Sequence, residues 1–222
     1  MARVVLKLGG RVASAAVAQA LTLCDAGDEV VVVHGAGPQI TAEMEARGIE
    51  PSFVGGRRVT TPEVLEVVRA SLAAVNAEVC SALGLLACGL AGDEIGLQAE
   101  RVPELGLVGI PVPCAPTAVL DALADGMVPV IAPLAAGPLN VNADEAAAAL
   151  AVGIGADRIE FVTDVPGVLL DDEVMGQIAA ADADRMLAAG RFEGGIVPKL
   201  VAAVQAARAG VRAEIGATQV IA

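Results

Sequence analysis

The stretch Val4-Val5-Leu6-Lys7-Leu8-Gly9-Gly10 decides the fold of this chain. A short run of aliphatic residues that ends at two glycines predicts a buried strand followed by a tight turn. Residues 13–24 then have a helical composition, and a second strand-like run covers residues 29–33. A strand, a helix and a second strand in this order indicate parallel strands joined by a helical crossover.

The same alternation continues outward from this unit. Strands are predicted at residues 86–90, 127–131 and 159–163, with a short strand near the C-terminus; helices are predicted at residues 39–47, 62–83, 143–151 and 197–209. Residues 97–116 read as irregular strands and turns. This pattern is typical of an α/β fold with a mostly parallel sheet, and 222 residues without a linker favour one domain over residues 1–222.

Composition excludes several classes of protein. The chain is 55% hydrophobic and 18% charged, which is too apolar for intrinsic disorder. A net charge of −13 and a pI of about 4.4 argue against nucleic acid or an anionic membrane as a partner. The uncharged run Leu105 to Leu120 contains three prolines, so no membrane span is expected there. Four scattered cysteines predict a reducing, cytoplasmic location.

Only two of the 14 Lys and Arg residues are lysines, Lys7 and Lys199. Where arginine serves as the general cation, a remaining lysine is more often needed as a compact ammonium group. Lys7 lies inside an apolar run, where an ammonium group is costly without a partner, although it could also extend to solvent. Lys199 follows two glycines and Pro198 at a predicted helix start, where a cation opposes the helix dipole. We interpret both as contacts to an anion.

The segment Asn140-Val141-Asn142-Ala143-Asp144-Glu145 has two interpretations. Asn142 can cap the following helix, and the two acidic residues complement its dipole. Alternatively, Asp144 orients the two lysine ammonium groups in a shared cleft. The segment alone does not decide between them.

Arginine and histidine offer further candidates. Arg58 is suited to pair bidentately with a carboxylate, although either Arg57 or Arg58 could be a surface arginine. His34 could be a general base, but we favour a role in orienting the loop that follows it. No set of His, Cys and acidic residues has metal-ligand spacing, and neither a Walker A motif nor G-x-G-x-x-G is present.

Six motifs in a fixed order resemble the amino acid kinase family, and within it the acetylglutamate kinase branch. They are Lys7-Leu8-Gly9-Gly10, His34-Gly35-Ala36-Gly37-Pro38-Gln39, Arg58-Val59-Thr60, Asn140-Val141-Asn142-Ala143-Asp144, Thr163-Asp164-Val165-Pro166-Gly167-Val168 and Gly194-Gly195-Ile196-Val197-Pro198-Lys199. Each motif is weak alone, but together they cover residues 4 to about 210 and are highly specific.

The resemblance implies a three-layer α/β/α sandwich with an open, mostly parallel sheet. Its N-terminal half, roughly residues 1–137, would bind an acyl amino acid, and residues 138–222 would bind nucleotide. Implied catalytic residues are Lys7, Lys199 and Asp144, and implied substrate-binding residues are Ala36, Gly37, Arg58 and Asn140. Implied nucleotide-binding residues are Gly9, Gly10, Asp164, Val165, Pro166, Gly167, Val168, Leu169, Arg191, Phe192 and Glu193.

The implied reaction is ATP-dependent phosphorylation of the side-chain carboxylate of N-acetyl-L-glutamate, with Mg²⁺ accompanying ATP. A carboxylate needs no strong base, so transfer depends on positioning and on neutralising oxyanions. Alternatives are a kinase for carrier-bound aminoadipate, the isopentenyl phosphate or UMP kinase branches, and a non-catalytic sensor of acidic amino acids.

The sequence departs from the family pattern at three places. Ala36 stands where a glycine is usual, so strain is expected if that residue needs a positive φ. The stretch before the final strand is short, which puts ATP affinity in question. Nothing precedes the first strand, so we expect a homodimer that is insensitive to arginine.

Overall fold

Helices and strands alternate along the chain in the computed structural model, which describes residues 1–9, 13–163, 165–171 and 173–222. The helices are α1 (Ala13–Asp25), α2 (Gly37–Ala46), α3 (Pro62–Leu83), α4 (Thr117–Ala124), α5 (Ala143–Gly153), α6 (Ala180–Ala188) and α7 (Ile196–Arg208). The strands of the main sheet are β1 (Arg3–Leu8), β2 (Glu29–His34), β5 (Ala87–Ala91), β8 (Val128–Ala132), β11 (Arg158–Val162), β14 (Gln177–Ala179), β15 (Arg212–Ile215) and β16 (Thr218–Ile221).

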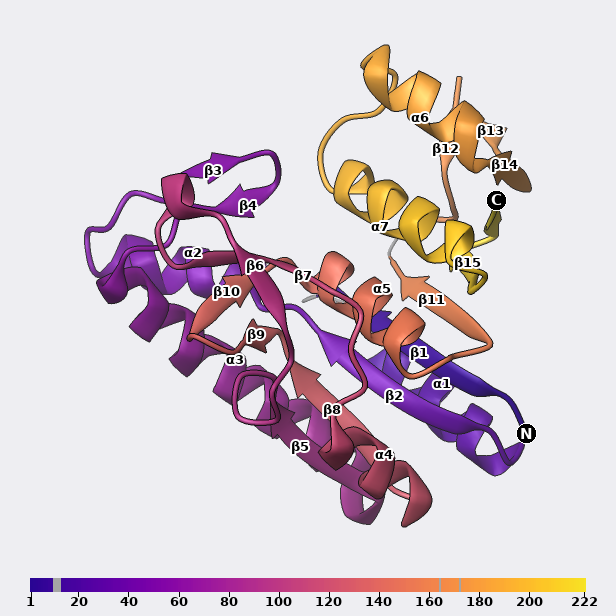
Figure 1. Ribbon diagram of the computed structural model, residues 1–222, viewed down its shortest axis with the longest axis horizontal. Helices are drawn as coiled ribbons and strands as arrows, with labels where there is room; N and C mark the ends of the chain where they lie inside the picture. The colour runs from indigo at the N-terminus through magenta and orange to yellow at the C-terminus, as the bar shows by residue number, and fades with distance from the viewer. Residues whose placement is uncertain (10–12, 164, 172) are drawn as a thin grey trace.

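The main sheet has the strand order β14-β16-β15-β11-β1-β2-β8-β5. All neighbouring pairs are parallel except β15 and β16, which form an antiparallel hairpin. Strand β1 lies in the middle, between β11 and β2, and Figure 1 shows helices on both sides of this sheet. The predicted α/β class with a mostly parallel sheet is confirmed.

Side chains alternate between the two faces of each strand. The main sheet therefore has one hydrophobic core on each face. Val4 and Leu6 pack on the face that α1, α2 and α3 cover, whereas Val5 packs on the face that α4, α5 and α7 cover. Lys7 has the same parity as Val5, so it points toward α5. His34, at the end of β2, has the parity of Val32 and points toward α3. The sheet therefore separates Lys7 from His34.

Helix α3 is long and apolar enough to cross a membrane by length and composition alone. It contains Val64, Val67, Val68, Leu72 and Val79, all buried. The helix packs on β5 and β8, and its N-terminus is capped by Thr61 Oγ1, which accepts a hydrogen bond from Val64 N at 3.2 Å. These contacts are those of a core helix.

Smaller sheets and short elements account for the rest of the described chain. A four-stranded sheet has the order β6-β7-β10-β9, and two hairpins pair β3 with β4 and β12 with β13. These strands are β3 (Phe53–Val54), β4 (Arg57–Arg58), β6 (Ala99–Arg101), β7 (Val108–Pro111), β9 (Leu134–Ala135), β10 (Leu139–Val141), β12 (Leu169–Leu170) and β13 (Glu173–Val174), with 3-10 turns at Gly84–Leu86 and Pro103–Leu105.

Most of the predicted elements are confirmed within two residues, and several short ones were not predicted. Helices α4 and α6 have eight and nine residues, and the strands of both hairpins have two residues each, too few for a clear period. The short strand predicted near the C-terminus is present, but as one of two strands, because β15 and β16 turn sharply at Gly216, where φ is +54°.

Candidate active site

Asp144 lies between the two lysine ammonium groups. Its Oδ1 is 2.8 Å from Lys7 Nζ, and its Oδ2 is 3.7 Å from Lys199 Nζ. The side chains of Lys7, Asp144 and Lys199 are only 6%, 7% and 15% exposed. The structure therefore brings these three residues together, and the alternative in which Lys7 extends to solvent is wrong.

The N-terminus of α5 fixes the position of this carboxylate. Asn142 Oδ1 accepts hydrogen bonds from the backbone N–H groups of Asp144 at 2.8 Å and Glu145 at 3.2 Å, so the predicted cap is present. An acidic side chain is also stabilised by the helix dipole at this end. Both interpretations of the segment thus hold together, because the capped first turn carries the carboxylate that faces the lysines.

The electrostatics of Lys7 reflect two opposing influences. Burial lowers the pKa of this ammonium group, Asp144 raises it, and the nearby positive charge of Lys199 lowers it further. Lys199 Nζ also donates a hydrogen bond to Gly195 O at 3.3 Å, within the first turn of α7. The cluster holds two cations on one carboxylate, so it carries an excess positive charge that suits a ligand anion.

A first cavity, of about 460 Å³, opens beside this cluster. Its lining joins the carboxyl end of β1, the start of α2, the β3–β4 hairpin, β10 and the start of α5. The lining includes Lys7, Gly9, Gly35, Ala36, Gly37, Pro38, Phe53, Arg57, Arg58, Asn140, Asn142, Asp144, Gly195 and Lys199. The substrate-binding candidates Ala36, Gly37, Arg58 and Asn140 thus lie in one cavity with the lysines.

Arg58 is a buried cation in this cavity, only 7% exposed. Its Nη2 donates to Thr41 Oγ1 at 2.8 Å and to Gly37 O at 3.3 Å, and its guanidinium carbon lies 4.5 Å from the centre of the Phe53 ring. Burial lowers its pKa. No acidic side chain in the described part of the chain forms a salt bridge with Arg58, so the cavity presents a guanidinium group that can bind a carboxylate.

The structure answers two questions that the sequence left open, the role of Arg57 and the backbone conformation of Ala36. Arg57 forms a bidentate ion pair with Glu145, so it already has a carboxylate partner. Ala36 precedes α2 with a φ of −141°, and the strain expected for a positive φ is absent. An alanine therefore fits this position.

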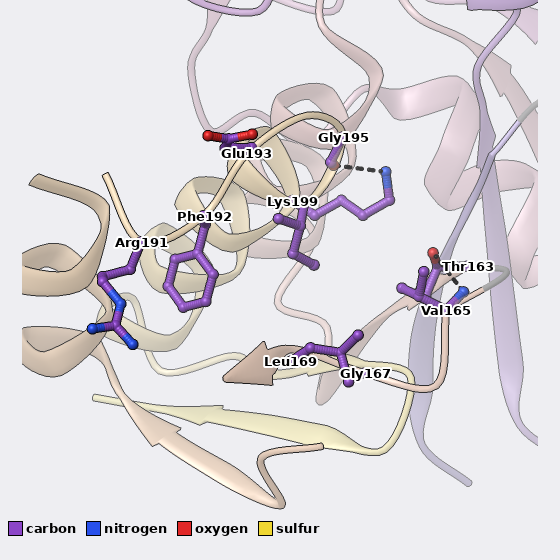
Figure 2. Close-up of a pocket in the computed structure, with 10 residues that line it drawn as sticks. Thr163, Val165, Gly167, Leu169, Arg191, Phe192, Glu193, Gly195 and Lys199 are labelled. Carbon is purple, nitrogen blue, oxygen red and sulfur yellow. Dashed lines mark hydrogen bonds between the residues drawn. The ribbon is translucent and has the colours of Figure 1, made fainter. Parts of the chain in front are cut away.

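A second cavity, of about 410 Å³, lies on the other side of Lys199 (Figure 2). Thr163, Val165, Gly167 and Leu169 face the segment 191–199 across it, and Figure 2 shows the Phe192 ring and the Leu169 side chain on opposite sides. Its described lining is Thr163, Val165, Gly167, Leu169, Arg191, Phe192, Glu193, Gly195, Ile196 and Lys199.

Three further nucleotide-binding candidates, Gly9, Pro166 and Val168, do not line the second cavity. Gly9 lines the first cavity and not the second. Val168 is buried, and its N–H donates to Thr218 Oγ1 at 2.8 Å, while Pro166 O accepts from Ala217 N at 2.8 Å. Gly10 and Asp164 lie outside the described residues.

The two cavities share Gly195 and Lys199. A ligand in each cavity would therefore meet its neighbour at the Lys199 ammonium group, next to Asp144 and Lys7. Six ordered motifs thus meet in one α/β fold around two adjoining cavities, and residues 2–216 match the family model of the amino acid kinase family. The chain belongs to this family.

Similar proteins agree with this membership. A protein from Rubrobacter xylanophilus named acetylglutamate kinase is 44% identical, and the match covers 97% of this chain and 88% of that protein. Another of that name, from Frankia casuarinae, is 39% identical, and the match covers 95% of this chain and 65% of that longer protein. In the solved structures, smu.665 from Streptococcus mutans superposes with a TM-score of 0.90 at 27% identity, over 99% of this chain and 98% of that one.

In this amino acid kinase, His34 is isolated from both cavities. It is 1% exposed, and its Nε2 lies 3.1 Å from Asn76 Nδ2 of α3, which also donates to Val130 O at 2.8 Å. Burial lowers the pKa of His34 to about 4. The histidine is therefore neutral near pH 7 and sits on the α3 side of the sheet, away from both cavities, which argues against a general base; the loop-orienting role stays a prediction.

This buried histidine predicts a pH effect on stability. The unfolded chain binds a proton at His34 below about pH 6.5, whereas the folded chain does so only below about 4. The free energy of unfolding therefore falls as the pH drops from 6.5 to 4, by about 3 kcal/mol for a difference of about 2.5 pKa units. Urea unfolding at pH 7 and pH 4.5 should show a smaller loss for His34→Gln than for the wild type; equal losses would contradict this prediction.

Sequence reasoning missed several residues of this amino acid kinase site. Thr41, Met44 and Phe53 surround the Arg58 guanidinium, and Glu145 holds Arg57. Glu145 was interpreted only as a dipole partner, because nothing in the sequence places residues 57 and 145 side by side. Among the described residues, no group of three or more His, Cys, Asp or Glu side chains could hold a metal ion.

Proposed function

We propose that this amino acid kinase transfers the terminal phosphoryl group of ATP to the side-chain carboxylate of N-acetyl-L-glutamate, a step of arginine biosynthesis. The names of the similar proteins support this substrate. The observation that carries the proposal is the pair of ammonium groups on Asp144 at the junction of two cavities. A sensor that binds one amino acid would not require such a pair between two cavities.

The acyl amino acid binds in the first cavity. The α-carboxylate pairs with the Arg58 guanidinium, which has no acidic partner among the described residues. Ala36 and Gly37 at the start of α2, together with Asn140, bind the rest of the substrate. Asn140 is oriented by Thr60, whose Oγ1 accepts its Nδ2 hydrogen bond at 3.0 Å. The side-chain carboxylate then points toward Lys7.

ATP binds in the second cavity. Val165, Leu169 and Phe192 offer apolar surface to the base, and the phosphates extend toward Lys199. Gly167, Arg191 and Glu193 complete the nucleotide site, and Gly9 faces the transferred group from the first cavity. Because Asp144 already pairs with both lysines, Mg²⁺ would be held mainly by phosphate oxygens and water, and would help to neutralise their charge.

Transfer is an in-line displacement. The substrate carboxylate oxygen forms a bond to the terminal phosphorus as the bond from that phosphorus to the bridging oxygen of ADP breaks. Lys7 on the acceptor side and Lys199 on the nucleotide side stabilise the oxyanions, and Asp144 holds both ammonium groups in place. No proton has to be removed from the nucleophile, which agrees with the absence of His34 from both cavities.

We also propose a cytoplasmic homodimer. Strand β5 is the last strand of the main sheet, and the turn before it exposes Leu85 and Leu86, which are 97% and 38% exposed. An unpaired edge strand beside exposed leucines supports contact with a second copy. Sedimentation should give the mass of a dimer, and a monomeric mass at micromolar concentration would contradict this.

The substrate is tested by a coupled assay of ADP release. N-acetyl-L-glutamate, L-glutamate and N-acetyl-aminoadipate are compared as acceptors at fixed Mg-ATP. The proposal expects the highest kcat/KM with N-acetyl-L-glutamate. A rate with this acceptor no higher than the rate without any acceptor would overturn it.

Replacing Arg58 with alanine should mainly raise the KM for N-acetyl-L-glutamate, by about 100-fold, because a buried bidentate charge pair to the substrate is lost. The KM for ATP should change little, since Arg58 does not line the second cavity. Initial-rate kinetics with each substrate varied in turn measure both values. An unchanged KM for the acceptor would reassign the carboxylate contact to Arg57.

A further inference from the structure

The Arg57–Glu145 ion pair joins two parts of the first cavity that are 88 residues apart. Arg57 Nη2 lies 2.6 Å from Glu145 Oε1, and Arg57 Nε lies 3.1 Å from Oε2. The Glu145 side chain is only 9% exposed, and the Arg57 side chain is 24% exposed. A bidentate pair with so little solvent access fixes the orientation of both groups.

The β3–β4 hairpin has little internal structure of its own. Its two strands pair over two residues each, and both glycines at its tip, Gly55 and Gly56, have a positive φ. A second polar contact to the start of α5, from Asn142 Nδ2 to Gly56 O, is long at 3.4 Å. Because such a short hairpin is marginally stable alone, its position depends on the contacts at its ends and on the ion pair.

The ion pair acts on the substrate site through the neighbouring residue. Arg57 and Arg58 are consecutive in β4, so their side chains point to opposite faces of the strand. Arg57 reaches Glu145 on α5, whereas Arg58 reaches Thr41 and Gly37 on α2. A hairpin held at Arg57 therefore also holds the backbone that carries the Arg58 guanidinium.

The first turn of α5 supplies one carboxylate to the two lysines and a second carboxylate to Arg57. Asp144 pairs with the two lysines, and Glu145, the next residue, pairs with Arg57. The same capped turn thus sets the distance between the phosphoryl-binding ammonium groups and the strand of Arg58.

We propose that Arg57 and Glu145 are positioning residues whose ion pair holds the β3–β4 hairpin on α5 and thereby places Arg58 for substrate binding. Neither residue contacts the transferred phosphoryl group. The kinetic part of this inference rests on the proposed function, since its readout is the KM for N-acetyl-L-glutamate. The structural part is independent of it, since it concerns how firmly the hairpin is held without substrate.

The test uses Glu145→Gln, Arg57→Gln and the double variant. Glu43→Gln is the matched control, because it breaks an exposed Arg–Glu pair on α2, in which both side chains are 45% exposed. Hydrogen–deuterium exchange of residues 52–59 is followed without substrate, and ADP release gives kcat and both KM values. Thermal melting verifies that each variant is folded.

All three variants at the pair should exchange faster in the hairpin. They should also raise the KM for N-acetyl-L-glutamate about tenfold, because a buried interfacial pair is lost, with the KM for ATP unchanged. Glu43→Gln should match the wild type in every measurement. Wild-type hairpin exchange and a wild-type acceptor KM in Glu145→Gln would overturn the proposal.

The double variant distinguishes two causes of a raised KM: a hairpin that is no longer held in place, and a single buried charge left without a partner. If the single variants suffer only from an unpaired buried charge, removing both charges restores the wild-type KM, and the proposal fails. If the pair positions the hairpin, the double variant remains impaired. A wild-type protein with no acceptor-dependent ADP release would contradict the proposed function instead, and the exchange rates of the hairpin would then decide the structural part alone.

Discussion

Lys7→Arg should lower kcat by about 10²–10³-fold, the usual cost of removing one group that stabilises a developing oxyanion. Lys7 Nζ lies in a buried space 2.8 Å from Asp144, and its side chain is 6% exposed. A guanidinium group keeps the charge but is planar and larger than an ammonium group, so it cannot occupy the same point beside the transferred phosphoryl group. The KM values for both substrates should change much less than kcat.

Steady-state kinetics measure this effect, and Arg47→Lys is a suitable control because Arg47 forms an exposed pair with Glu43. The control should keep the wild-type kcat. Equal kcat values for Lys7→Arg and the wild type would remove Lys7 from the chemistry, and with it the role proposed for the paired ammonium groups.

Asp144→Asn should impair both stability and activity, because the buried Lys7 and the partly buried Lys199 lose their shared carboxylate. Removing one partner of a buried charge pair typically costs about 3–5 kcal/mol, and the free energy of unfolding should fall by about this amount. The amide has nearly the same shape, so the loss reflects charge and not packing. The kcat should fall about 100-fold, since neither lysine is held in place.

Urea unfolding and initial rates test this prediction together. Glu145→Gln provides a matched change of one carboxylate to an amide in the same turn of α5, and it should leave kcat far closer to the wild type. An Asp144→Asn variant with wild-type kcat would show that the lysines are positioned without the carboxylate. A variant with unchanged stability would show that the folded state tolerates both ammonium groups without this carboxylate.

Much of the fold could be predicted because the apolar runs have clear lengths and ends. Five of the eight strands of the main sheet and five helices follow from runs bounded by glycine and proline, and α3 was predicted with its observed bounds, Pro62–Leu83. The grouping of Lys7, Asp144 and Lys199 was one of two open interpretations of residues 140–145, and the family resemblance implied it.

The parts that could not be predicted depend on contacts between distant segments. Arg57 and Arg58 are adjacent and chemically alike, and only the three-dimensional position of Glu145 distinguishes them. The environment of Arg58 likewise depends on segments distant in sequence, since α2 brings Met44 to it and the hairpin brings Phe53. The β3–β4 hairpin has no period in its sequence, because each of its strands has only two residues.

The buried alanines of helix α5 have a consequence for the active site. Its run of buried alanines, residues 146–149 with Ala151, lies directly behind the carboxylate turn and packs against α7 and the middle of the main sheet. Methyl side chains bring the helix close to its neighbours and leave no flexible atoms that could absorb a larger group. The position of the Asp144 carboxylate therefore depends on the packing of alanines that line neither cavity.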